Sequence, residues 1–111
     1  MKIETQDYND ITVVKMQGEF TADTIKILQD MASSIMAVGT PKIVLDMTDI
    51  GFIDSQGLEQ LLWMKGYCAE NERQLKLAGM DENCEKIMVI TRLLSQFDTY
   101  IEVNEAVRSF V

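Results

Sequence analysis

The most constraining feature of the sequence is a short, nearly continuous apolar run, Lys42-Ile43-Val44-Leu45-Asp46-Met47. A strand with one face in water alternates apolar and polar residues, whereas a strand covered on both faces is apolar almost throughout. The run therefore predicts the central strand of a sheet. The rest of the chain must supply the neighbouring strands and the helices that cover them.

Two β segments and a helix are expected before this run. Lys2–Tyr8 and Ile11–Met16 are predicted to form two strands, and the Asn-Asp turn between them predicts a hairpin. Helical spacing follows, with Thr21 as a candidate N-cap and with Gly39 and Pro41 as stop signals. The apolar face of this helix is expected to consist of Ile25, Leu28, Ala32 and Ile35.

A second helix is predicted directly after the central strand. Either Asp54 or Ser55 could cap its start, since both residue types accept hydrogen bonds from the first turn of a helix. The inward face of this helix is expected to consist of Leu58, Leu61, Leu62, Lys65, Cys68 and Ala69.

Two strands and two helices are expected in the last third of the chain. Gln74–Ala78 alternates like a strand, a third helix follows from Asp81, Tyr100-Ile101 is a short strand, and Asn104 is expected to cap a last helix. The apolar positions are Ile87, Ile90 and Leu94 in the third helix and Ala106, Val107 and Phe110 in the last. The order ββαβαβαβα predicts an α/β fold with a mixed sheet and right-handed crossover helices.

Length and hydropathy favour a single domain over residues 1–111, because one hydrophobic core typically serves about 100 to 150 residues. The apolar runs are far shorter than the roughly 20 residues that span a bilayer. The start of the chain, Met1–Glu4, also lacks the charged and apolar regions of a signal peptide. We therefore expect a cytoplasmic protein without a membrane segment.

Charge and residue types exclude several functions. The net charge of -8 opposes binding to nucleic acid or an anionic membrane and favours encounter with a basic protein surface. The chain has no histidine, and Cys68 and Cys84 are too far apart for a CxxC pair, so no zinc set or histidine-based triad can form. Both cysteines are expected to be reduced and structural. No phosphate-binding loop is present, and we predict neither an enzyme nor a cofactor.

Three aspartates lie around one loop region, at Asp46, Asp49 and Asp54. Carboxylates so arranged could hold Mg²⁺, but turn chemistry and helix capping also account for them. We predict no metal site.

The segment Asp54-Ser55-Gln56-Gly57 follows the central strand, at the end of a sheet where α/β proteins place their functional loops. Ser55 stands at a helix N-terminus, where the helix dipole stabilises added negative charge. A phosphate there would add about -1.5 to -2 charge beside Asp54 and near Glu59, and would repel a docked partner. Gly57 would permit close approach by another chain. The alternative is that Asp54 or Ser55 serves only as an N-cap.

Four segments occur in the order that characterises a known family. They are a strand ending in Gly-Glu, a Val-Leu-Asp strand, a Phe-Ile-Asp-Ser-Gln-Gly-Leu turn and a terminal Glu-Ala-Val helix. Their positions are Val13–Phe20, Val44–Asp46, Phe52–Leu58 and Asn104–Phe110. With these segments the chain resembles a STAS domain, and specifically the bacterial anti-sigma factor antagonists. The resemblance covers nearly the whole chain and implies a single STAS domain over residues 1–111.

The resemblance implies a function by partner switching. In that family the serine directly after the aspartate, here Ser55, is phosphorylated by a partner that is both an anti-sigma factor and a serine kinase. A PP2C-type phosphatase reverses the modification. The unphosphorylated protein would bind the anti-sigma factor and free a sigma factor, and phosphorylation would release the partner.

The partner-binding surface is expected to include Asp54, Gln56, Gly57, Glu19, Thr21 and Trp63. Two positions depart from the family pattern: members often have a second hydroxyl residue in place of Gln56 and an aspartate in place of Thr21. Trp63 and Tyr67 are four residues apart with Met64 beside them, so they form either an exposed apolar patch next to Ser55 or part of the core.

Two other functions remain open. Within the same fold the chain could be a scaffold subunit, as in stressosome-like or transporter assemblies, with Ser55 never modified. A small-ligand or nucleotide-binding protein is a rival of another class, although no pocket motif supports it. The sequence also leaves homodimer formation open.

Overall fold

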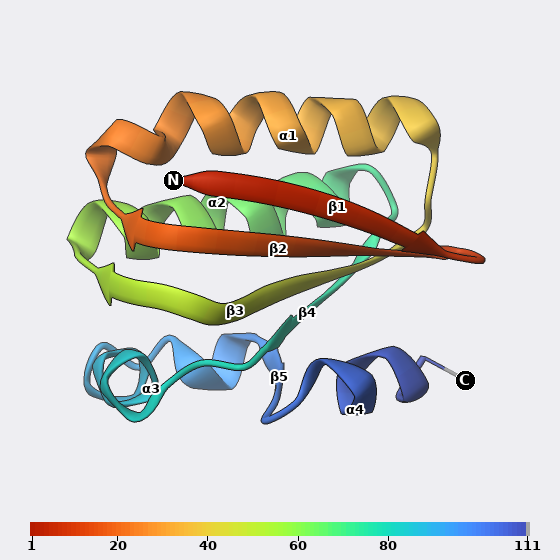
Figure 1. The fold of residues 1–111 in the computed structure, drawn as a ribbon. Coiled ribbons are helices and arrows are strands. Elements are labelled where there is room, and N and C mark those ends of the chain that lie inside the picture. The colour runs from red at the N-terminus through yellow and green to blue at the C-terminus, as the bar shows by residue number, and fades with distance from the viewer. Residues whose placement is uncertain (111) are drawn as a thin grey trace.

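The computed structural model describes residues 1–110 and contains one five-stranded mixed sheet (Figure 1). The strands are β1 (Lys2–Tyr8), β2 (Ile11–Phe20), β3 (Lys42–Ile53), β4 (Gln74–Ala78) and β5 (Asp98–Tyr100). They lie side by side in the order β1-β2-β3-β4-β5, with β1 antiparallel to β2 and the other neighbours parallel. The predicted hairpin and the predicted central strand are confirmed.

Helices cover both faces of the sheet. They are α1 (Ile25–Val38), α2 (Ser55–Glu70), α3 (Glu82–Ile90) and α4 (Val103–Arg108), with short 3₁₀ turns η1 (Ala22–Thr24) and η2 (Leu94–Gln96). The main core joins α1, α2 and α3 to one face, and a smaller cluster joins α4 to the other. None of the helices in residues 1–110 is long and apolar enough to cross a bilayer. The predicted α/β order is confirmed.

The central strand β3 is buried on both faces, as its apolar run predicts. Ile43 and Leu45 belong to the main core, whereas Val44 between them belongs to the cluster under α4, and all three are 0% exposed. Successive side chains of a strand point to opposite faces, so β3 contributes to both layers at once.

Strands β2 and β3 are longer than predicted, because the expected ends at Met16 and Met47 were both too early. The parallel ladder between them continues until Phe20 pairs with Ile53, with irregularities near Gly18, whose φ is 118°. Phe20 is 0% exposed, so its burial favours extension of the strand past the glycine. The extended ladder carries both strands directly to the start of α2.

The last third of the chain differs from prediction in its details. Ile90, the last residue of α3, is 73% exposed, because the helix buries the side that carries Cys84 and Met88 instead. Ile101 lies outside β5 and is 84% exposed. Asn104 does not cap α4, since the N-cap position is Glu102, which makes no side-chain cap.

The two cysteines are buried free thiols, and burial raises the pKa of each from an ordinary value of 9.0 to about 11. The carboxylates of Asp81 and Glu85 add to the effect at Cys84. The thiolate is the reactive form, so both groups should be inert while the chain is folded.

We predict that iodoacetamide modifies Cys68 and Cys84 slowly in the native protein at about pH 8 and rapidly in urea, because the folded state holds both thiols protonated and shielded. The stabilisation from these neutral thiols is present below pH 9 and is lost as the pH rises toward 11. Intact-mass spectrometry over time measures the modification. Equal rates in native buffer and in urea would contradict a buried location.

Candidate functional site at the start of α2

The strand β3 passes into α2 through a single residue, Asp54, which is the N-cap of the helix. Its carboxylate Oδ1 accepts a hydrogen bond from the Gly57 N–H at 3.0 Å, and its carbonyl accepts one from the Leu58 N–H at 3.0 Å. Of the two candidate caps, the structure therefore selects Asp54. The cap fixes the direction in which the helix leaves the sheet.

Ser55 is the first residue of α2 and its side chain is exposed. Within residues 1–110, no hydrogen bond engages its hydroxyl. Because Asp54 satisfies the cap, Ser55 has no capping role to fulfil. The result is an accessible hydroxyl beside the positive end of a 16-residue helix.

Gly57 is buried, and the backbone that it approaches closely belongs to this chain and not to a partner. A Cβ at this position would collide with the carbonyl oxygen of Phe20 and lie 2.7 Å from Cγ1 of Ile53. The close approach expected at Gly57 thus occurs between the first turn of α2 and the ends of β2 and β3. Gly57 was predicted to belong to the partner surface, but its burial gives it a supporting position beneath that surface.

Gln60 is a polar side chain that is only 6% exposed, and the sequence reading did not single it out. Its amide nitrogen donates to the carbonyl of Thr21 at 2.6 Å and to that of Gln56 at 3.2 Å, while its oxygen accepts from the Thr24 hydroxyl at 3.0 Å. These bonds connect α2 to η1. The available signal was its spacing, since Gln60 lies on the same helix face as Gly57 and Met64.

Thr21 and Glu19 lie next to the start of α2 because the long β2–β3 ladder brings them there. Glu19 is exposed and pairs in register with Phe52, and Thr21 follows the last residue of β2. The Thr21 hydroxyl accepts from the Asp23 N–H at 3.4 Å, so it caps the 3₁₀ turn η1 and not α1 as predicted.

Trp63 is 37% exposed and stacks on Tyr67, with ring centroids 4.8 Å apart. Met64 beside them is 0% exposed and belongs to the core, so it is not part of this patch. On the same helix Lys65 and Ala69 are exposed, which corrects the predicted inward face.

A shallow groove of about 220 Å³ between α1 and α2 begins beside the tryptophan. Its lining residues are Ile25, Leu28, Gln29, Gln56, Glu59, Gln60 and Trp63. Because Gln56 directly follows Ser55, this groove adjoins the accessible hydroxyl. The structure thus places an aromatic side chain and a partly apolar hollow on the same surface as Ser55.

The three aspartates around this region have separate partners. Asp46 accepts from the Thr48 hydroxyl at 2.6 Å, Asp49 pairs with Lys15 at 3.3 Å, and Asp54 caps α2. Turn chemistry, an ion pair and capping therefore account for them. Among residues 1–110, no group of three or more histidine, cysteine or acidic side chains is arranged to hold a metal ion.

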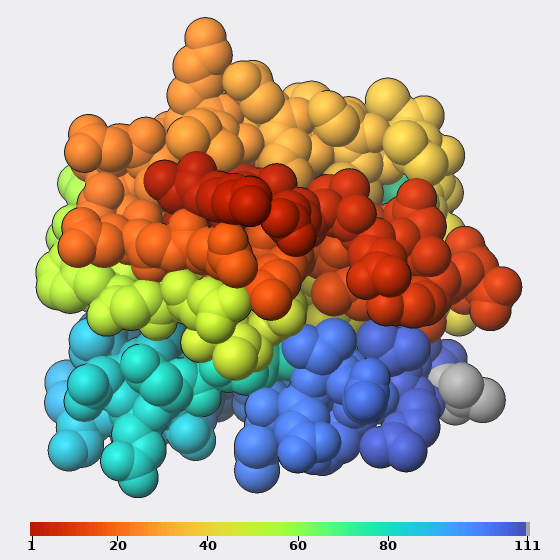
Figure 2. Space-filling model, viewed as in Figure 1, coloured from red at the N-terminus to blue at the C-terminus, as the bar shows by residue number. Residues whose placement is uncertain are grey.

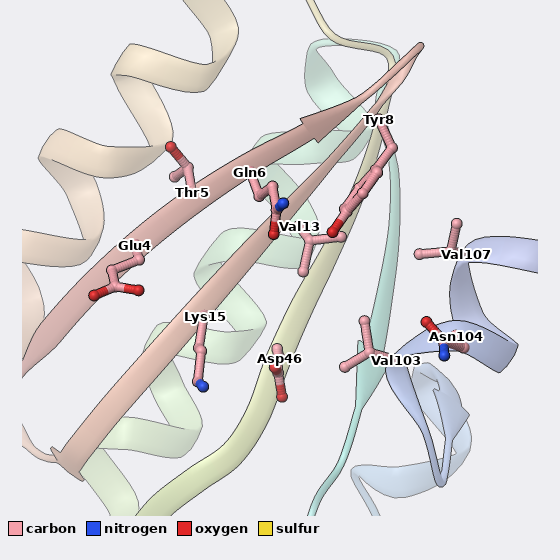
Figure 3. A pocket seen from close by; sticks show the side chains of 10 residues that line it. All are labelled: Glu4, Thr5, Gln6, Tyr8, Val13, Lys15, Asp46, Val103, Asn104 and Val107. Carbon is pink, nitrogen blue, oxygen red and sulfur yellow. The ribbon is translucent and has the colours of Figure 1, made fainter.

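A separate hollow of about 710 Å³ lies on the face of the sheet that carries α4 (Figure 3). Its lining residues are Glu4, Thr5, Gln6, Tyr8, Val13, Lys15, Asp46, Val103, Asn104 and Val107. None of them comes from the segment at the start of α2. This hollow is separate from the candidate site.

Comparisons with known proteins agree with this architecture. Residues 2–106 match the family model described as STAS domain. An anti-sigma-B factor antagonist of Staphylococcus epidermidis is 25% identical over 93 residues, which cover 84% of this chain and 86% of the relative.

Solved structures with the same fold include a putative anti-sigma factor antagonist from Thermotoga maritima, with a TM-score of 0.87 at 18% identity, covering 96% of this chain and 92% of that one. The Bacillus cell fate determinant SpoIIAA in its phosphorylated form has a TM-score of 0.74 at 14% identity, covering 99% and 100%.

We predict that Gly57→Ala lowers the free energy of unfolding by about 1–3 kcal/mol, because the added methyl group has no space against the Phe20 carbonyl. Gly66→Ala on the same helix is the matched control, since a Cβ there meets nothing within 4 Å. It should stabilise the protein by about 0.5–1 kcal/mol through helix propensity. Urea unfolding measures both, and equal effects would contradict the close packing of Gly57.

Proposed function

Because the chain belongs to the STAS domain family, we propose that it is an anti-sigma factor antagonist switched by phosphorylation of Ser55. The unphosphorylated chain binds an anti-sigma factor that is also a serine kinase, and so frees a sigma factor. It acts in the cytoplasm by binding and not by catalysis. The name of the Staphylococcus epidermidis relative and the fold shared with phosphorylated SpoIIAA support this function.

The observation that carries the proposal is the exposed hydroxyl of Ser55 on a rigid helix start. Asp54 makes the cap, so the serine can be modified without loss of a helix-stabilising bond. A kinase active site can reach an exposed side chain at the rim of the fold. A PP2C-type phosphatase would have the same access for the reverse reaction.

Electrostatics determine which form of the protein, phosphorylated or unphosphorylated, binds the partner. The N-terminus of α2 stabilises a phosphate locally through its dipole and its unpaired N–H groups. The same phosphate adds about -1.5 to -2 charge beside Asp54 and on the side of the helix where Glu59 is exposed. A partner that covers this surface would have to bury the added charge. Phosphorylation therefore leaves the fold intact and releases the partner.

The partner surface that we propose is built from the two strand ends and from α2. Glu19 and Thr21 contribute from the end of β2, and Asp54, Gln56 and Trp63 contribute from the start and the first turns of α2. Gly57 and Gln60 hold this surface in shape from beneath, since both are buried. Thr21 cannot form the ion pair that an aspartate would form there, so the partner's basic residues have Glu19 and Asp54 to contact.

Peptide mapping of protein purified from its own cells should place a phosphate on Ser55, and phosphatase treatment should remove it. A kinase captured with the unphosphorylated chain should bind Ser55→Ala as tightly as the native protein. It should bind Ser55→Asp at least about tenfold more weakly, because the added carboxylate opposes docking.

Ser34→Asp is the matched control, since Ser34 is an exposed serine on the side of α1 that faces β1. It should bind the kinase with native affinity. Unmodified Ser55 under all growth conditions, together with equal affinities of the three Ser55 forms, would overturn the switch. That result would favour a scaffold subunit of a larger regulatory or transporter complex.

We further predict that Trp63→Ala weakens binding to the same kinase by roughly tenfold or more, since a half-exposed aromatic beside a hollow is a typical binding hot spot. Val89→Ala on α3 removes an apolar side chain that is 56% exposed and should leave affinity unchanged. Isothermal calorimetry compares the two. An unaltered affinity for Trp63→Ala would remove this residue from the partner surface.

A further inference from the structure

One edge of the sheet is a long strand with an open side. Within residues 1–110, strand β1 pairs only with β2, in an uninterrupted antiparallel register from Lys2 to Tyr8. Six of its seven side chains are exposed, the exception being Ile3. It contains no proline and no bulge, which are two of the features by which proteins block an edge. The unpaired backbone groups of β1 are available to another strand.

A groove of about 310 Å³ runs beside this edge, between β1 and α1. Three side chains from one face of β1, those of Ile3, Thr5 and Asp7, form one wall. The other residues of the groove are Thr12, Ile27, Met31, Ser34, Ile35 and Val38. Within residues 1–110, α1 is the helix that lies beyond β1 at this end of the molecule, and the two surfaces adjoin in the space-filling view (Figures 1 and 2).

The helix contributes a mostly apolar stripe to the groove, in which Ile27 and Val38 are exposed and Met31 is buried. Ile27, Met31, Ser34 and Val38 follow one another at intervals of three and four residues, so they lie on one face of α1. Ile27 is 40% exposed and Val38 is 72% exposed. Covering the apolar side chains of this stripe would remove apolar surface from water, which is favourable in free energy.

The two features have the geometry of strand addition. A strand paired to the open edge of β1 would direct every second side chain to the face of the sheet on which Ile3 and α1 lie. Those side chains would enter the groove and cover Ile27 and Val38. Main-chain hydrogen bonds and alternate side-chain pockets would then act together.

Charge indicates the chemistry of the added strand. Asp7 is the only charged residue among the described residues that line the groove. Asp23 and Asp30 are exposed and lie about one helical turn before and after Ile27, along one side of the stripe. The exposed Lys26 lies between them, so the carboxylates outnumber the ammonium group there by two to one. With a net charge of -8 on the whole chain, the surroundings favour a strand that carries lysine or arginine.

A second copy of this chain fits the edge less well. It would bring the same net charge of -8 and its own α1, which projects past β1 in Figure 1. In a two-fold arrangement the two α1 helices would meet over the joined edges. An isolated extended segment brings no second α1 helix, so this contact between helices does not arise.

We propose that the edge of β1 and the groove beside α1 bind an extended, basic segment of a partner protein by strand addition. The bound segment places aliphatic side chains over Ile27 and Val38 and basic side chains near Asp7, Asp23 and Asp30. This surface is distinct from the one around Ser55, and it does not depend on phosphorylation.

The test is a titration of the full chain with the peptide acetyl-Lys-Ile-Lys-Val-Lys-Ile-Lys-amide, followed by nuclear magnetic resonance of backbone amides. The largest shifts should fall in β1 and α1, and β1 amides should exchange with solvent more slowly in the complex. A peptide with glutamate in place of lysine should bind at least about tenfold more weakly, because the groove is flanked by carboxylates.

Val38→Lys should weaken binding of the lysine peptide by about tenfold, since it removes apolar contact and adds a like charge. Ile90→Lys is the matched control, because Ile90 is also the last residue of its helix and is 73% exposed, but lies on α3. The Ile90→Lys variant should bind the lysine peptide with native affinity.

Shifts confined to other elements, equal affinity of both peptides or no effect of Val38→Lys would overturn the proposal. A dimer joined through β1 without peptide, seen by ultracentrifugation, would also overturn it.

Discussion

The parallel ladder between β2 and β3 is the constraint on which the candidate site depends. Because the two strands stay paired until Phe20 and Ile53, the Phe20 carbonyl lies where the chain turns into α2. That oxygen accepts the Asp54 N–H at 3.3 Å and contacts the surface of Gly57. The side chain of Gln60 then donates a hydrogen bond to the next carbonyl along the chain, that of Thr21. One strand end thus positions the cap, the glycine and the first turns of the helix.

The sequence predicted the order of elements and the place of the site, because both depend on local signals. The apolar run of β3, the hairpin turn and the Asp-Ser-Gln-Gly segment can each be recognised within a few residues. It did not predict how far β2 and β3 extend, since Gln17–Phe20 and Thr48–Ile53 contain glycines and polar residues. Their pairing with each other holds them in the sheet, and that pairing is long-range.

The other differences between the predicted and the observed structure also arise from contacts between residues far apart in the sequence. Gln60 reads as a surface residue until its partners, the Thr21 carbonyl and the Thr24 hydroxyl, are brought next to it by the fold. Ile90 reads as a core residue, but two residues after Met88 it lies on the side of α3 opposite to the buried Cys84 and Met88. In short helices the buried face is decided by what lies opposite and not by the composition of the helix itself.

The hydrogen bonds of Gln60 have a consequence for the kinetics of partner exchange. They join the starts of η1 and α2 into one unit, so the backbone of the proposed docking surface is already ordered in the free protein. A preorganised surface loses little conformational entropy on association. Association and release would then follow the charge at the interface, without waiting for a slow rearrangement of the fold.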